Sequence, residues 1–316
     1  MAQTKNQRTN VLRATLHAID EVFWPLSASD SPQRKEPASV KKMKKGDACW
    51  ATRKRILGWD IDTESSTLHL PPHCFDRLRE ILTWLLPPNR RLSINKWHQV
   101  LGELRSMSPA LPGTRGLLFS VLEVGLQHTE HNRVRLTPRI HDLAHDFLAL
   151  LRSVHNRPTQ LQELVPTQPS DVCACNACRL GMGGVWFDEL DRTSPPIVWR
   201  QPFSDTISRD LVTSDNPAGT ISISDLELAA VLAHQDVLCT TCDVRERTLW
   251  IGSDNRAAVS WATKGSATSY AARSHLLRLN ALHQRAYRYV ARHQYLPGLV
   301  NAMVDAASRR WDLNDE

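Results

Sequence analysis

The chain has 316 residues, with 39 Lys and Arg against 33 Asp and Glu, a formal net charge of +6 and a pI near 9.0. This length suffices for two ordinary domains, and the basic surplus favours a polyanionic partner, because basic surfaces attract phosphate backbones. No apolar run reaches the ~18 residues that span a bilayer; the polar N-terminus lacks the apolar segment of a secretory signal, and the seven cysteines do not resemble a secreted disulfide framework. We therefore expect an intracellular protein, cytoplasmic or nuclear, with reduced thiols and no membrane.

The first half is predicted to be mostly helical. Apolar residues at spacings of three and four predict a helix over 11–24, which a stretch rich in Ser, Pro and charge ends at 27–39. Residues 56–70 predict two short strands around a polar turn. Further helices are predicted over 75–86, 93–107, 115–126 and 138–154.

A basic run lies between the first helix and these strands. It is either an ordinary solvated face or a strip that contacts phosphates. Its members are Lys41, Lys42, Lys44, Lys45, Arg53, Lys54 and Arg55.

The second half changes its periodicity. Residues 156–171 carry three prolines and polar spacers, which predicts a connection between domains. Strands are predicted over 172–179, 183–187, 197–203, 248–253 and 290–296, and helices over 224–238, 256–263, 270–289 and from Asn301 onward. This order predicts an α/β fold with a five-stranded mixed sheet flanked by helices. We therefore expect a helical region over 1–155, a linker over 156–171 and an α/β domain over 172–316.

Three carboxylates stand at positions that can converge in such a fold. Glu227 lies on the first helix of the second half, Asp254 follows a strand, and Asp305 is near the start of the last helix. Acids at strand ends and on facing helices can gather around a hard cation. Taken singly, each also fits a surface charge or a helix cap.

The contexts of these acids carry a family resemblance. The segments CNACRLGMGGVW, ISDLELAAVLA, LWIGSDNRAAVSW and YLPGLVNAMVDAASR resemble, in this order, the four motif blocks of retroelement RNase H domains. The family blocks read Asp-Ala-Ser before a glycine-rich strand, Glu-Leu-x-Ala, Asp-Asn or Asp-Ser, and Pro-Gly-x-x-Asn-x-x-x-Asp-x-x-Ser-Arg. The last block is matched by Pro297, Gly298, Asn301, Asp305, Ser308 and Arg309. The resemblance spans about residues 172–311 and implies an RNase H-like sheet.

The resemblance also implies a metal site. It gives Glu227, Asp254 and Asp305 catalytic and metal-binding roles, with Mg²⁺ or Mn²⁺ as the cofactor. At the family's first aspartate, which bridges two ions, this sequence has Asn176. Two dications ~4 Å apart repel by ~16 kcal/mol at an effective dielectric of about 20. We therefore expect the neutral amide to leave weak or single metal occupancy and little hydrolysis.

The first half resembles the thumb and connection of a reverse transcriptase. The matching residues are Leu57-Gly58-Trp59, Leu101-Gly102-Glu103-Leu104 and Leu111-Pro112-Gly113. No Tyr-x-Asp-Asp motif occurs. The resemblance implies a fragment of a reverse transcriptase/RNase H polyprotein without its polymerase palm, which binds RNA–DNA hybrid or other nucleic acid.

Two alternatives remain at this point. One is an active metal-dependent RNase H that tolerates Asn176. The other is a non-catalytic nucleic-acid-binding module, or one stabilised by zinc on Cys173, Cys175 and Cys178 with Cys239 and Cys242. Buried thiols that pack as small hydrophobes are the ordinary interpretation of these cysteines. Likewise, core packing is favoured over base stacking for Trp59 and Trp97.

Overall fold

The computed structural model describes residues 4–23, 49–56, 58–87, 91–127, 129–167, 171–188, 193, 195–267, 272–298 and 301–309. The chain divides into two compact units, Met1–Lys54 and Arg55–Glu316. The first unit contains helix α1 (Lys5–Phe23), which includes most of the helix predicted from residue 11. The second unit contains the elements that position the candidate site.

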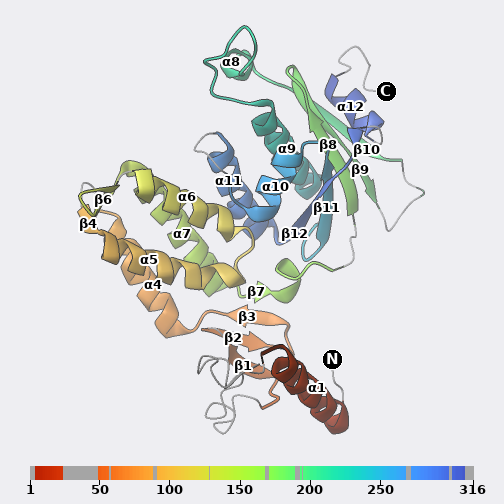
Figure 1. Ribbon diagram of the computed structural model, residues 1–316. Coiled ribbons are helices and arrows are strands. Elements are labelled where there is room, and N and C mark those ends of the chain that lie inside the picture. Colours follow the sequence, from red (N-terminus) through yellow and green to blue (C-terminus); the bar gives the residue numbers. More distant parts are fainter. Residues whose placement is uncertain are drawn as a thin grey trace. The chain divides into compact units, whose positions relative to one another are not determined.

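A five-stranded mixed sheet forms the core of the α/β part (Figure 1). Its strands are β8 (Asp171–Ala177), β9 (Gly181–Asp188), β10 (Ile197–Pro202), β11 (Thr248–Ser253) and β12 (Val290–Tyr295). In space they run β10-β9-β8-β11-β12. The pairs β8–β9 and β9–β10 are antiparallel, whereas β11 is parallel to both β8 and β12. The predicted fold class, an α/β fold with a five-stranded mixed sheet flanked by helices, is confirmed.

Helices pack on both faces of this sheet, and they approach it closely at two adjacent glycines of β9. Neighbouring residues of a strand point to opposite faces. A Cβ atom on Gly183 would lie 2.8 Å from the main chain of Ala307, on α12 (Ala302–Arg309), whereas one on Gly184 would overlap the ring of His234, on α9 (Ile223–Thr241). The glycine-rich second strand therefore lets α9 and α12 approach opposite faces.

The remaining α/β helices follow the predicted order. They are α10 (Arg256–Lys264) and α11 (Ala272–Tyr287), and both pack near α9. A short helix, α8 (Asp205–Asp210), was not predicted.

Helices dominate residues 72–156, as expected. They are α4 (Pro72–Leu85), α5 (Ile94–Met107), α6 (Thr114–Gln127) and α7 (Pro138–Asn156), with a 3-10 turn, η1 (Ser108–Ala110). Their apolar faces form one core, in which Trp59 and Trp97 are each only 2% exposed. Core packing is therefore confirmed for these two tryptophans.

Two small sheets accompany these helices. One has the order β1-β2-β3-β7, from strands β1 (Arg53–Ile56), β2 (Trp59–Asp62), β3 (Thr67–His69) and β7 (Thr159–Gln160). The other has the order β4-β6-β5, from β4 (Arg91–Ser93), β6 (Arg133–Arg135) and β5 (Thr129–Glu130). The sequence predicted only the strands within 56–70.

Helix α6 lies directly against α11, again through glycines. A Cβ atom on Gly113 would lie 2.6 Å from Cα of Ala281, and one on Gly116 would lie 2.6 Å from the carbonyl oxygen of Leu277. Gly113 also has a φ of +69°, a backbone conformation that L side chains disfavour. The helical region and the α/β part are thus packed backbone to backbone within the second unit.

A buried charge network joins the same two parts. The Glu163 carboxylate, at the end of the 3-10 turn η2 (Leu161–Glu163), is 0% exposed. It accepts from Arg157 at 2.5 Å and lies 3.5 Å from Arg285 and 3.9 Å from Arg288. Burial lowers the pKa of Arg285 to about 10.

Arg285, on α11, also binds the end of the helical region directly. It donates to Ser153 Oγ at 3.1 Å, to Thr159 Oγ1 at 2.9 Å and to the Arg157 carbonyl at 2.6 Å. Part of the predicted linker, 156–171, is therefore packed structure. The division at this linker stays a prediction, and Arg55–Glu316 form one compact unit.

No helix in the described ranges has both the length and the apolar character needed to cross a membrane.

We expect Arg285→Met to lower the free energy of unfolding by ~3–5 kcal/mol, because it leaves buried partners of the guanidinium unsatisfied. Urea unfolding followed by tryptophan fluorescence measures this change. Arg245→Met is the matched control, because Arg245 pairs with Asp243 on the surface, where both side chains are more than half exposed. Equal shifts of the urea midpoint in the two variants would contradict a structural role for the buried network.

Candidate nucleic-acid and acid-cluster site

Strand β8 places Asn176 in the middle of the sheet. Asn176 pairs with Gly183 of β9, and its side chain is 1% exposed. It points toward the face covered by α12, because its amide reaches two side chains of that helix. The position predicted for the family's first aspartate is therefore a buried one beside α12.

The Asn176 amide is a hydrogen-bond donor to Asp305. Its Nδ2 donates to Asp305 Oδ1 at 2.5 Å and to Ser308 Oγ at 3.1 Å, while Ser308 Oγ donates to the Asp305 carbonyl at 3.1 Å. The reverse amide orientation would place two acceptor oxygens against each other, so the donor assignment follows from chemistry. A carboxylate at position 176 would instead repel Asp305.

Asp305 lies on the first turn of α12. Its main-chain N–H donates to the Asn301 carbonyl at 2.9 Å, and its Oδ1 lies 3.4 Å from Arg309 Nη2, one turn further along the helix. The side chain is 34% exposed. Asp305 therefore keeps access to solvent while Asn176 and Arg309 balance its charge.

Glu227 reaches the same place from α9. It is 4% exposed, and Ser253 Oγ donates to its Oε2 at 3.4 Å. Burial first, then repulsion by Asp254 and Asp305, raises the pKa of Glu227 to about 8. Glu227 is thus mostly protonated at neutral pH.

Asp254 directly follows β11. Burial and the nearby charge of Asp305 raise the pKa of this carboxyl, while Arg309 opposes that shift. The Pro297-Gly298 segment lies across from it, since a Cβ atom on Gly298 would be 3.6 Å from Asp254 Oδ2. Mutual electrostatic effects among Glu227, Asp254 and Asp305 indicate that the three acids face one space.

Asn176 is the one neutral side chain among the four predicted site residues. Among the residues that the structure describes, no three His, Cys, Asp or Glu side chains are grouped as ligands of one ion. Asn176 offers Asp305 an N–H donor at a position where a carboxylate would offer oxygens, and an N–H group cannot bind a cation.

Asp225 lies outside this group. It caps α9 through a reciprocal bond with Ser222, and it pairs with Arg273 at 2.9 Å. Its role is to hold the start of the helix that carries Glu227.

Sequence reasoning assigned no role to two serines at the site. Ser308 bonds Asn176 and Ser253 bonds Glu227. The matched Asp-x-x-Ser-Arg block could have identified Ser308 as a site residue. For Ser253 the only indication in the sequence was its position directly before Asp254.

The predicted basic strip is only partly described. Lys41, Lys42, Lys44 and Lys45 lie outside the described residues. Arg53, Lys54 and Arg55 belong to β1. Arg55 bonds Asp60 at 2.7 Å and Lys54 donates to the Cys49 carbonyl at 2.9 Å, so at least these two groups already have protein partners.

The described cysteines are all free thiols and form no metal cluster within the described part of the chain. Cys173 and Cys175 are buried, and their thiols point to carbonyls of Trp250 and Gly252. Cys178 instead donates to the Ser308 carbonyl at 3.0 Å. These contacts favour packed thiols over the zinc alternative.

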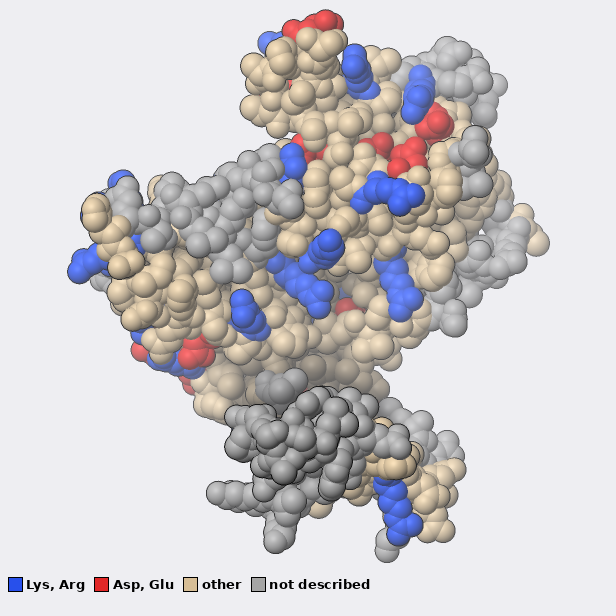
Figure 2. All heavy atoms as spheres, viewed as in Figure 1, with Lys and Arg blue, Asp and Glu red and all other residues tan. Residues whose placement is uncertain are grey.

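Figure 2 shows acidic atoms gathered over the region of α9, β8 and α12, with Lys and Arg groups around them. Negative and positive side chains therefore lie close together on this face, where a ligand could contact both.

No protein-family model matches the chain, and no curated protein sequence matches it either. Among solved structures, RNase H1 from Halobacterium salinarum is similar over 44% of this chain and 95% of its own, at 11% identity and a TM-score of 0.32. LC11-RNase H1 in complex with RNA/DNA hybrid is similar over 44% and 94%, at 13% identity and a TM-score of 0.32.

A foamy viral protease-reverse transcriptase in complex with RNA/DNA hybrid is similar over 78% of this chain but only 30% of its own length, at 11% identity and a TM-score of 0.32. Similarity this distant does not show that this chain has the activity of these proteins.

The raised pKa of Glu227 predicts a pH-dependent stability. Its pKa in the folded chain is about 8, whereas the ordinary value is 4.5. Between these pH values the folded chain therefore keeps a proton on Glu227 that the unfolded chain has lost. The associated stability is fully present below pH 4.5 and is lost as the pH rises through about 8. Above that pH, and without divalent ions, we expect the free energy of unfolding to be ~2–4 kcal/mol higher for Glu227→Gln than for the parent chain.

Urea unfolding across this pH range, in a chelating buffer, measures the effect. Glu80→Gln is the matched control, because its side chain is 73% exposed. Parallel pH profiles for the parent chain and Glu227→Gln would show that Glu227 does not titrate in this window.

Proposed function

We propose that the chain is the thumb/connection-like and RNase H-like part of a retroelement reverse transcriptase, that it binds RNA–DNA hybrid, and that its hydrolytic activity is impaired. The proposal keeps the division into a helical region over 1–155, a linker over 156–171 and an RNase H-like domain over 172–316. One observation carries it: the Asn176 amide donates to Asp305 within a group of acids that otherwise matches the family's order.

Impairment follows from the charge at this position. Three carboxylates crowd one space, and burial and repulsion keep Glu227 protonated near neutral pH. Mg²⁺ or Mn²⁺ would have to displace that proton and the Asn176–Asp305 hydrogen bond before binding. Both changes oppose metal binding, so occupancy by one ion at most, and weakly, is expected.

Binding does not require those ions. A nucleic-acid backbone needs cationic groups and an open face. The chain carries a net charge of +6, and Lys and Arg groups surround the acids on the face in Figure 2. A hybrid on this face is contacted through its phosphates, with the acids toward the RNA strand.

The first test restores the missing carboxylate. We expect the parent chain to cleave a labelled RNA–DNA hybrid at background level in Mg²⁺, and Asn176→Asp to raise cleavage by at least about a hundredfold, because a bridging charge then offsets the repulsion between ions. Denaturing gel electrophoresis of the labelled RNA measures the product.

The controls separate metal chemistry from folding. The double variant Asn176→Asp, Asp254→Asn should lose the gained activity. Asn176→Asp should also be less stable than the parent chain in chelator and recover in Mg²⁺, because the ion relieves the added repulsion. Robust cleavage by the parent chain that Asp254→Asn abolishes would instead establish the active-nuclease alternative.

The second test concerns the basic run. We expect hybrid affinity to fall steeply with salt, because binding releases counterions from the phosphates. Replacement of Lys41, Lys42, Lys44 and Lys45 by Gln should reduce the slope of log K against log salt by ~0.9 for each phosphate that these lysines neutralise in the parent chain. Fluorescence anisotropy of a labelled hybrid measures both.

Arg79→Gln is the matched control for this test, because Arg79 already bonds Asp76 at 3.0 Å on the outer face of α4. An unchanged slope in the fourfold lysine variant would remove the basic run from the nucleic-acid interface.

A further inference from the structure

A large pocket lies where the helical region meets the α/β part, away from the acid group. Its volume is about 710 Å³, and none of Asn176, Glu227, Asp254 or Asp305 lines it. Its walls come from η1 and the start of α6, from η2, from the end of α10, from α11 and from the start of β12. This volume lies within the range of ~300–1,000 Å³ typical of small-molecule sites.

Two buried amides on α11 face this pocket with unused hydrogen-bonding groups. Asn280 is 8% exposed and Gln284 is 7% exposed. Gln284 Nε2 donates to Asn280 Oδ1 at 3.2 Å. Within the described residues this is the only side-chain bond of either amide, which leaves Asn280 Nδ2 as a donor and Gln284 Oε1 as an acceptor.

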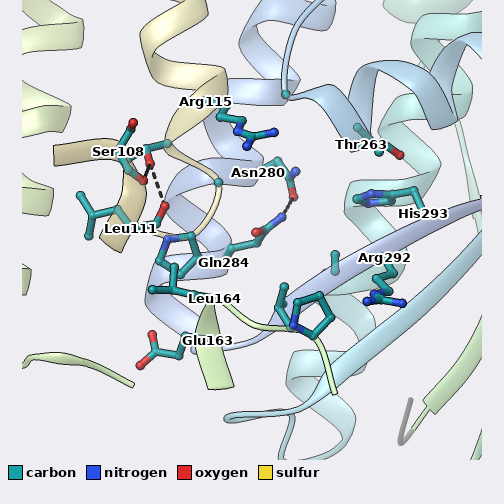
Figure 3. Close-up of a pocket in the computed structure, with 18 of the residues that line it drawn as sticks. Ser108, Leu111, Arg115, Glu163, Leu164, Thr263, Asn280, Gln284, Arg292 and His293 are labelled. Atoms are coloured by element: carbon teal, nitrogen blue, oxygen red, sulfur yellow. Dashed lines mark hydrogen bonds between the residues drawn. The ribbon is translucent and has the colours of Figure 1, made fainter. Parts of the chain in front are cut away.

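Figure 3 shows Arg115 on α6 beside the amide pair of α11, while Arg292 and His293 of β12 border the pocket from the other side. Arg292 and His293 are neighbours on one strand, so their side chains leave it on opposite faces. A ligand in this pocket can therefore meet the amide pair and Arg115 together.

The charge available in the pocket is positive. Glu163 is the only acid among the described residues that line it, and three arginines already surround that carboxylate. Arg115 and Arg292 are exposed, and neither has an acidic partner among the described residues. The pocket thus offers the guanidinium of Arg115 together with a neighbouring donor and acceptor (Figure 3).

We propose that this pocket binds a nucleotide, with its phosphate on Arg115 and its base edge on the Asn280–Gln284 pair. Guanidinium groups bind phosphate through paired N–H donors. Bases present neighbouring donors and acceptors on their Watson–Crick edges, which complement one amide N–H and one amide carbonyl. A bare anion would bind only the guanidinium and leave the amide pair to water.

Two kinds of ligand present a phosphate and a base edge together: a free mononucleotide and the 5′-phosphorylated end of a strand. The pocket is closed on several sides by η1, η2 and α11, which favours the free form, because a strand needs an exit for its second residue. The site is independent of the proposed hybrid-binding face, since it shares no residue with the acid group or the basic run.

Isothermal titration calorimetry on the full chain tests the proposal with AMP, CMP, adenosine, inorganic phosphate and a 5′-phosphorylated trinucleotide. We expect the mononucleotides to bind at least about tenfold more tightly than either adenosine or phosphate. Arg115→Ala, at an exposed position of α6, and Asn280→Ala should each weaken AMP binding by at least about tenfold. Arg179→Ala, an exposed arginine outside the pocket, should leave it unchanged.

Each other outcome overturns part of the proposal. Phosphate binding equal to that of AMP would remove the base contact, and stronger binding of the trinucleotide would assign the pocket to strand ends. No heat with any probe, or AMP binding unaffected by Arg115→Ala, would refute the site. Thermal melting of each variant checks the fold, and hybrid binding by Arg115→Ala reports on the other face separately.

Discussion

The buried ion network around Glu163 is the interaction on which the second unit depends. A carboxylate that is 0% exposed is stable only with charged partners, and its partners come from both sides: Arg157 follows α7, whereas Arg285 is on α11 and Arg288 directly follows that helix. The network therefore fixes the helical region against the α/β part. The close contact of Gly113 and Gly116 with α11 acts in the same direction, and together these contacts shape the walls of the large pocket.

A second constraint operates at the acid group, where like charges must be balanced within a partly buried space. In a two-ion site cations provide that balance. Here an amide N–H and an arginine provide it for Asp305, and protonation provides it for Glu227. Asn176, near the end of β8, thus supplies a neutral donor at a place where a carboxylate of nearly the same size would add another negative charge.

The order of elements in the α/β part was predictable, because each motif block has a strong local pattern. Alternating and glycine-rich residues marked β8 and β9, and a capped helix marked α9 around Glu227. The short strands β4, β5 and β6 were not predictable, since two or three residues show no periodicity and pair only through distant partners. The six-residue helix α8 gave no pattern long enough to recognise.

The candidate site was predictable as a set of residues but not as an arrangement. Sequence identified Glu227, Asp254, Asp305 and Asn176 from motif order. The donor role of Asn176 and the raised pKa of Glu227 depend on distances and burial that arise only when β8, α9 and α12 pack together. Glu163 illustrates the same limit, because its position in a proline-rich segment indicated a connection between domains, whereas packing buries it completely.

The amino-acid sequence by itself determined the class of fold, the order of its strands and helices and the identity of the group at each motif position, since these depend on local periodicity and residue type. Only the tertiary structure decided how the acids are balanced, that the helical region is joined to the α/β part through Arg285, and that a pocket with free amides and arginines lies between them. Those features depend on contacts between residues more than a hundred positions apart, and the strength of such contacts depends on burial.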